Sequence, residues 1–100
     1  MWQAGNDEIV HAKLCFGLAH KYGGKRLAPG AFPIENNTVE VETDLAGVVG
    51  AVAYEGGIGE TLSVVRAAAQ LAKVVDPGAR KVLETIVSDE ARHAGLAWKV

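Results

Sequence analysis

The sequence predicts an all-α fold, a helical bundle formed by a single domain over residues 1–100. Alanine, leucine and valine dominate the chain, and 49% of its residues are apolar, which favours helices and is enough for a compact core. Alternation of the kind found in a β-strand is confined to residues 38–42. One eight-residue pattern with helical spacing recurs near both ends. We therefore expect about three helices and no sheet.

The first helix is expected over about residues 7–21. Asn6 would serve as its N-cap, and Gly23 and Gly24 would end it. Residues 22–42 then form a loop that contains two prolines. Such a loop is long for so small a domain, so it predicts a crossover along the bundle rather than a tight turn.

A second helical region is expected over about residues 43–75, loosened at Gly56 and Gly57. Asp76 and Pro77 next supply an N-cap and a proline at the first helical position. These predict a third helix from Pro77 to the C-terminus, which would form a hairpin with the second. Three helices with apolar faces cannot close a four-helix core, so we expect a homodimer or a higher homo-oligomer.

The repeated pattern carries the chemistry. Residues 7–14 read Asp-Glu-Ile-Val-His-Ala-Lys-Leu, and residues 89–96 read Asp-Glu-Ala-Arg-His-Ala-Gly-Leu, with five of the eight positions identical. The spacing puts Glu8 with His11, and Glu90 with His93, on one face of each helix. Each pair could bind one metal ion. Two such pairs on separate helices provide half of the dinuclear carboxylate site that helical bundles build.

Glu60 is the natural third contributor from the second helical region. It lies 16 residues before the turn at residue 76, and Glu90 lies 14 residues after it, so the two carboxylates should come level across the hairpin. Glu55 also belongs to this region. In an ideal α-helix it would sit about 140° around from Glu60 and a turn further out. We therefore expect Glu55 to face solvent or to contact the metal ligands without binding the metal itself.

These residues resemble a family, the ferritin-like superfamily of non-haem diiron carboxylate proteins. Residues 89–93 are similar to its D-E-x-R-H motif on the last helix, and residues 7–11 to its Glu-x-x-His on the second helix. Residues 59–61, Gly-Glu-Thr, are similar to the lone glutamate of the third helix. The order of Glu-x-x-His, long crossover, glutamate, short turn and Glu-x-x-His also matches.

The resemblance implies a diiron centre that acts in oxygen, peroxide or iron redox chemistry, as in an oxidoreductase. Glu8 and His11 would bind one iron, and Glu90 and His93 the other. Glu60 would be a bridging or terminal ligand. Asp7 and Asp89 would contact the ligating histidines rather than the metal, because an aspartate in this position fixes the tautomer of a metal-bound histidine. The resemblance names neither a substrate nor a catalytic residue.

The chain also departs from the family pattern. The family's first helix, with its own glutamate, would come some thirty residues before Glu8, whereas only residues 1–6 precede the motif at residues 7–11 here. The sequence therefore resembles the second to fourth helices of the family, and the sixth ligand is missing. Either another copy supplies the missing helix, or the site is incomplete and empty. The alternative to an enzyme is a relic helical bundle that dimerises without metal.

Plainer interpretations stand beside these. Asp7 and Glu8 could simply complement a helix dipole, and Asp89 and Glu90 could belong to a solvated charged face. A net charge of −2 without a basic patch argues against nucleic acid, and no apolar stretch of the sequence is long enough to span a membrane. A single cysteine, Cys15, fits a reducing compartment such as the cytoplasm. Within the fold we expect Cys15 to be a buried apolar residue rather than a thiolate ligand.

Overall fold

The computed structural model describes residues 2–31 and 40–100. Its helical segments are α1 (Trp2–Gly23), α2 (Leu45–Ala51), the π-helix η2 (Val52–Gly59), α3 (Glu60–Leu71) and α4 (Pro77–Ala97). The described residues contain no strand, which confirms the all-α prediction. Of the segment that alternates in sequence, residues 40–42 have no regular secondary structure, and residues 38 and 39 lie outside the described residues.

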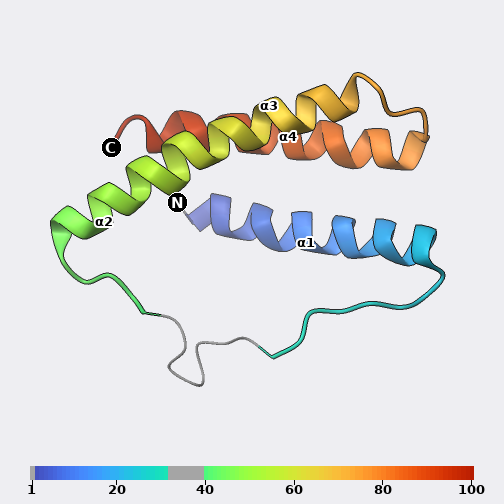
Figure 1. Cartoon of the computed structure of the whole chain (residues 1–100), viewed down its shortest axis with the longest axis horizontal. Coiled ribbons are helices and arrows are strands. Elements are labelled where there is room, and N and C mark those ends of the chain that lie inside the picture. Colours follow the sequence, from blue (N-terminus) through green and yellow to red (C-terminus); the bar gives the residue numbers. More distant parts are fainter. Residues whose placement is uncertain (1, 32–39) are drawn as a thin grey trace.

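The helical segments form three rods. The segments α2, η2 and α3 follow one another as a continuous rod, and α4 returns antiparallel to it (Figure 1). Along the other side of α4 lies α1, also antiparallel to it. Within the described residues α1 packs against α4 and makes no close backbone approach to α3. As a result α4 is the central helix, and the two Glu-x-x-His motifs lie on neighbouring antiparallel helices.

The prediction for the start of the first helix was wrong. Helix α1 begins at Trp2 rather than near Asp7, so Asn6 lies inside the helix and does not cap it. The carboxylate of Asp7 contacts α4 and helps to fix this end of α1 against its neighbour. The predicted stop is confirmed, because α1 ends at Gly23 and Gly24 has a φ of 65°, which favours glycine.

The described parts of the connection, residues 24–31 and 40–44, contain no helix or strand. The centre of the predicted crossover falls on residues 32–39, outside the described residues. Asp44 caps α2 by accepting a hydrogen bond from the Gly47 amide, at 3.2 Å. The second helical region therefore runs from residue 45 to residue 71, shorter at both ends than predicted.

The predicted start of the last helix is confirmed. Asp76 caps α4 by accepting a hydrogen bond from the Ala79 amide, at 2.8 Å, and Pro77 is the first helical residue. Asp76 also forms an ion pair with Lys21 at the end of α1, with 2.9 Å between Nζ and Oδ2. The amide of Ala79 and the charge of Lys21 lower the pKa of Asp76 to about 2. One aspartate thus starts α4 and ties it to α1.

The interior is small and has a polar centre. Among the described residues, the buried apolar side chains are Ala67, Ala79, Val82 and Ala94. Three charged or titratable residues are buried as deeply, namely His11, Glu90 and His93. None of the described helices is both long and apolar enough to span a membrane.

The predicted loosening at Gly56 and Gly57 takes the form of the π-helix η2. Both glycines allow the end of α4 to come close. A Cβ atom on Gly56 would lie 2.9 Å from the Cβ of Ala97, and one on Gly57 would lie 3.2 Å from the ring of Trp98. The indole Nε1 of Trp98 donates to Thr61 Oγ1 at 3.2 Å, and this hydroxyl donates to the Gly57 carbonyl at 2.6 Å. The packing fixes η2 against α4.

Candidate metal centre

The two repeated motifs meet face to face between α1 and α4. His11 comes from α1, and Glu90 and His93 come from α4. Their exposed fractions are 6%, 6% and 8%, which is unusual for groups that carry charge. The centroids of the two imidazole rings are 6.2 Å apart. The antiparallel packing of two similar motifs thus produces a nearly symmetric buried cluster.

The Nε2 atoms of the two histidines face aspartates of the opposite helix. His11 Nε2 lies 2.9 Å from Asp89 Oδ2, and His93 Nε2 lies 3.0 Å from Asp7 Oδ2. An ionised carboxylate can only accept, so each imidazole donates from Nε2. These hydrogen bonds are the largest cause that lowers the pKa values of Asp7 and Asp89.

Arg92 links the two halves of the cluster. Its Nη2 atom lies 2.7 Å from Asp7 Oδ2 and 3.0 Å from Asp89 Oδ1. One guanidinium group therefore holds both of the aspartates that contact the histidines. The sequence comparison of the two motifs pairs Arg92 with Val10, so no symmetric partner is available on α1.

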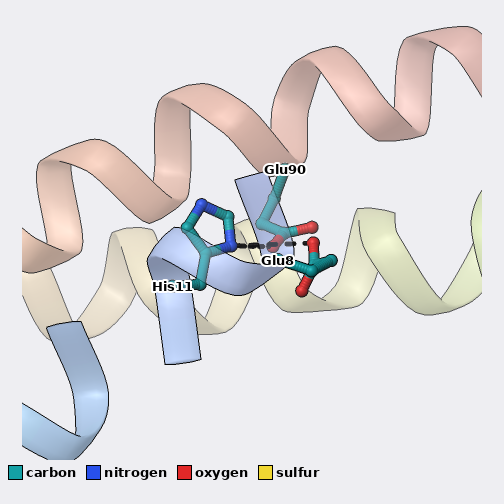
Figure 2. A group of neighbouring side chains, drawn as sticks. All are labelled: Glu8, His11 and Glu90. Carbon is teal, nitrogen blue, oxygen red and sulfur yellow. Dashed lines mark ion pairs between the residues drawn. The ribbon is translucent and has the colours of Figure 1, made fainter. Parts of the chain in front are cut away.

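The Nδ1 atoms face glutamates. Figure 2 shows His11 with Nδ1 directed at Glu90 and Glu8, at 3.1 Å and 3.6 Å from their Oε1 atoms. His93 Nδ1 lies 3.4 Å from Glu8 Oε1 and 3.5 Å from Glu90 Oε2. Both glutamates therefore approach both histidines. Of the two, Glu8 is open to solvent, with 55% of its side chain exposed.

Glu60 joins the cluster from the first residue of α3. One carboxylate oxygen of Glu60 comes within 4.8 Å of ligand atoms of both Glu90 and His93. A hydrogen bond shared with the Glu90 carboxylate, together with burial and the charge of Glu90, raises the pKa of Glu60 to about 7. The predicted alignment of Glu60 with Glu90 across the hairpin is confirmed.

The cluster is short of positive charge. Five carboxyl groups surround the two histidines, namely those of Asp7, Glu8, Glu60, Asp89 and Glu90. In the described chain, Arg92 is the one permanently charged cation that contacts them. Glu90 Oε2 is buried and makes no hydrogen bond with a described residue. A buried carboxylate oxygen without a partner is costly. The hydrogen bond with Asp7 and the nearby glutamates raise the pKa of His93 despite the opposing effect of burial.

The donor atoms fit divalent metal ions. Two groups have ligand atoms that converge, Glu8 with His11 and Glu90, and Glu60 with Glu90 and His93. They share Glu90. Ligand atoms about 2.1 Å from one ion lie roughly 3.0–3.4 Å apart in octahedral to tetrahedral geometry, and the distances from Nδ1 to the glutamate oxygens, 3.1–3.6 Å, are close to this range. Carboxylate and imidazole donors suit iron and manganese.

All five residues predicted as ligands lie in this cluster, and Asp7 and Asp89 contact the histidines as expected. Sequence reasoning missed that the aspartates cross over to the other helix and that Arg92 joins them. The predicted burial of Cys15 was wrong, because its side chain is exposed. Within the described chain Cys15 belongs to neither of the two groups that could bind a metal.

Open pockets flank the cluster on two sides. One of about 470 Å³ borders His93 and Arg92 and includes Lys99, just after the end of α4. The other, of about 450 Å³, is lined by residues of η2 and α3, among them Glu55 and Glu60. His93 and Glu60 of the cluster thus each border an open pocket.

Comparison of the chain with models of protein families, with characterised proteins and with solved structures finds no match.

Proposed function

We propose that this chain is a ferritin-like helical protein that binds two iron ions in the cluster between α1, α3 and α4. With this cluster the chain would act as an oxidoreductase in oxygen, peroxide or iron redox chemistry. The proposal draws on the motif resemblance, on the all-α fold and on the convergence of the five predicted ligands. It includes a reducing, cytoplasmic setting, which a chain with a single cysteine favours.

One observation carries the proposal: both nitrogens of both histidines face carboxylates. A neutral imidazole has a single N–H group, and the Nε2 atoms donate it to Asp7 and Asp89. The Nδ1 lone pairs would then point at the oxygens of Glu8 and Glu90. This arrangement is repulsive unless a cation lies between them. A metal ion at Nδ1 with a carboxylate on Nε2–H is the usual environment of a metal-bound histidine.

The residues would divide between two ions. Glu8 and His11 would hold one, Glu60 and His93 the other, and Glu90 would serve both. When bound, the iron would supply one-electron redox chemistry toward dioxygen or peroxide. Carboxylates give such an ion hard oxygen donors, and imidazoles give it borderline nitrogen donors.

The chain's own groups would prepare the site in three ways. Asp7 and Asp89, held together by Arg92, orient the two imidazole rings. The packing that buries Glu90 excludes bulk water from the centre. Glu60, with its pKa raised to about 7, can hold or release a proton near neutral pH as its surroundings change charge.

Thermal unfolding with and without metal tests the proposal. Anaerobic ferrous iron, or manganese as a surrogate, should raise the melting temperature, because a ligand that binds only the folded state stabilises it by about 2.7 kcal/mol at 100 times its Kd. The double variant Glu90→Ala, His93→Ala should abolish this rise. Because that variant removes two buried groups, Glu8→Gln provides a milder test at a side chain that is half exposed. An unchanged melting temperature of the wild type in excess metal would refute the metal site.

A second candidate is a homodimeric bundle without metal or enzymatic activity. Protonation of His93 would also satisfy its Nδ1 atom, and the raised pKa of His93 favours this state. Large apolar side chains are exposed on α1 and α3, including Ile9, Leu62 and Val65. The bundle without metal predicts a dimer whose melting temperature does not respond to iron or manganese, so the same experiment separates the two candidates.

A further inference from the structure

The π-helix changes the direction in which Glu55 points. In a continuous α-helix, Glu55 and Glu60 would face sides about 140° apart. In the structure the Glu60 amide donates to the carbonyl of Glu55, five residues earlier, as well as to that of Gly57. Hydrogen bonds from i to i+5 define a π-helix, and residues five apart then stand one turn apart on nearly the same face. Glu55 is thus brought around toward Glu60.

The packing of α4 holds this register. Gly56 and Gly57 are the residues of η2 that face the end of α4, at Ala97 and Trp98. These contacts fix the backbone of η2 next to Glu55. Glu55 and Glu60 line the same pocket. Short π-helical turns inside helices are frequent at functional sites.

The donor set of the cluster is one carboxylate short. A bundle that holds two ions uses two Glu-x-x-His pairs and a glutamate from each of two other helices, whereas the cluster in this chain has a single such additional glutamate, Glu60. Glu90 Oε2, buried and without a hydrogen bond among the described residues, lies 3.5 Å from His93 Nδ1, on the side of the cluster that Glu60 also approaches. This orphan oxygen is an independent sign that a cation belongs there.

We infer that Glu55 is a further carboxylate ligand of the centre, presented by the π-helix to the ion that Glu60, Glu90 and His93 hold. The inference rests on the proposed function and adds the carboxylate that the other motifs do not supply. Glu55 is exposed and has no ion pair or hydrogen bond with a described side chain, so its carboxylate is available to reach the ion. Glu55 would add one oxygen donor to that ion.

Calorimetric titration with manganese tests this inference on the full chain. Glu55→Gln keeps the shape of the side chain and removes its charge, and Glu84→Gln makes the same change at an exposed position of α4 outside the cluster. We expect the wild type and Glu84→Gln to bind two ions, and Glu55→Gln to bind one of them roughly 10- to 100-fold more weakly, the loss seen when groups that support a metal are removed. Because Glu55 is exposed, the metal-free variant should melt as the wild type does.

The outcomes separate the two proposals. If the wild type binds two manganese ions and Glu55→Gln binds both with unchanged affinity, Glu55 is no ligand, while the proposed function stands. If the wild type binds no manganese, the proposed function fails and the assignment of Glu55 falls with it. Glu55→Asp, which keeps the charge on a shorter side chain, should recover part of the lost affinity if the carboxylate coordinates. If Glu84→Gln weakens manganese binding as much as Glu55→Gln does, the loss is a general effect of charge, and the inference is overturned.

Discussion

His11 and His93 define the site at the scale of single residues, because each ring is held from both sides. The crossed contacts with Asp89 and Asp7 fix the rings through Nε2, at 2.9 Å and 3.0 Å. Nδ1 is then the only atom left to bind a metal. Since both aspartates share Arg92, the two rings are positioned by one network rather than by two separate pairs.

This network gives a prediction for the aspartates. Asp7→Asn and Asp89→Asn should each weaken manganese binding by about 10- to 100-fold, because the amide no longer accepts a strong hydrogen bond from Nε2–H and the ring loses its orientation. Titration calorimetry measures the affinity, and Glu84→Gln is the control of equal charge change. Equal affinity in all the variants would show that the aspartates do not support the ligands.

Glu60 gives a prediction for the pH dependence of the metal-free protein. Its pKa is raised from 4.5 to about 7 in the folded state, so the folded protein holds this proton more tightly than the unfolded chain does. The stabilisation is fully present below about pH 4.5 and is lost as the pH rises toward about 7. Unfolding by urea at about pH 5 and about pH 7.5 should therefore show a larger loss of stability for the wild type than for Glu60→Gln. Equal losses would contradict the shift.

The sequence contained enough information to predict which side chains share the cluster but not how they are arranged. A spacing of three residues on a helix places Glu and His on one face in any helix, so Glu8 with His11 and Glu90 with His93 followed from the pattern alone. Which aspartate meets which histidine depends on the direction of packing between α1 and α4. That information lies in contacts between residues 78 or more positions apart in the chain.

At the scale of elements, η2 is the feature that local sequence rules did not specify. Three glycines between residues 56 and 59 indicated a weak point in the helix, and the structure turns it into a π-helix. Its surroundings are tertiary: α4 comes so close that a Cβ atom at residue 56 would lie 2.9 Å from the Cβ of Ala97, and one at residue 57 would lie 3.2 Å from the ring of Trp98. The start of α1 was misjudged for a related reason, because its first turns are held by contacts of Asp7 with α4 rather than by a cap at Asn6.

The close approach of α4 predicts opposite effects for two glycines of the same rod. Gly56→Ala should destabilise the fold by about 1–3 kcal/mol, because the new methyl group would lie 2.9 Å from Ala97. Gly50→Ala, where nothing lies within 4 Å, should instead stabilise the helix by up to about 1 kcal/mol. Urea unfolding of the two variants gives both values. A neutral Gly56→Ala would mean that η2 and α4 are not packed as described.

At the scale of the whole molecule, polar groups occupy the centre and large apolar groups remain outside. The described interior includes four small apolar residues, whereas Leu62 and Val65 of α3 are 51% and 60% exposed. Burial of apolar surface is the main source of stability, so this distribution favours association of copies.

We therefore predict a mass of at least twice the 10.5 kDa of one chain in light scattering at micromolar concentration. Leu62→Lys combined with Val65→Lys should shift the protein toward the monomer, because the charges would have to be buried at the interface. A folded monomer of the wild type at all concentrations would contradict the dimer.

The most direct test of the account is the number of ions that one chain binds. Protein purified without a chelating tag, stripped of metal and titrated anaerobically with manganese should bind two ions per chain, in line with the two ligand groups that share Glu90. Glu90→Ala should remove both ions, since Glu90 belongs to each group. Binding of no manganese by the wild type, or retention of both ions by Glu90→Ala, would contradict a dinuclear centre in this cluster.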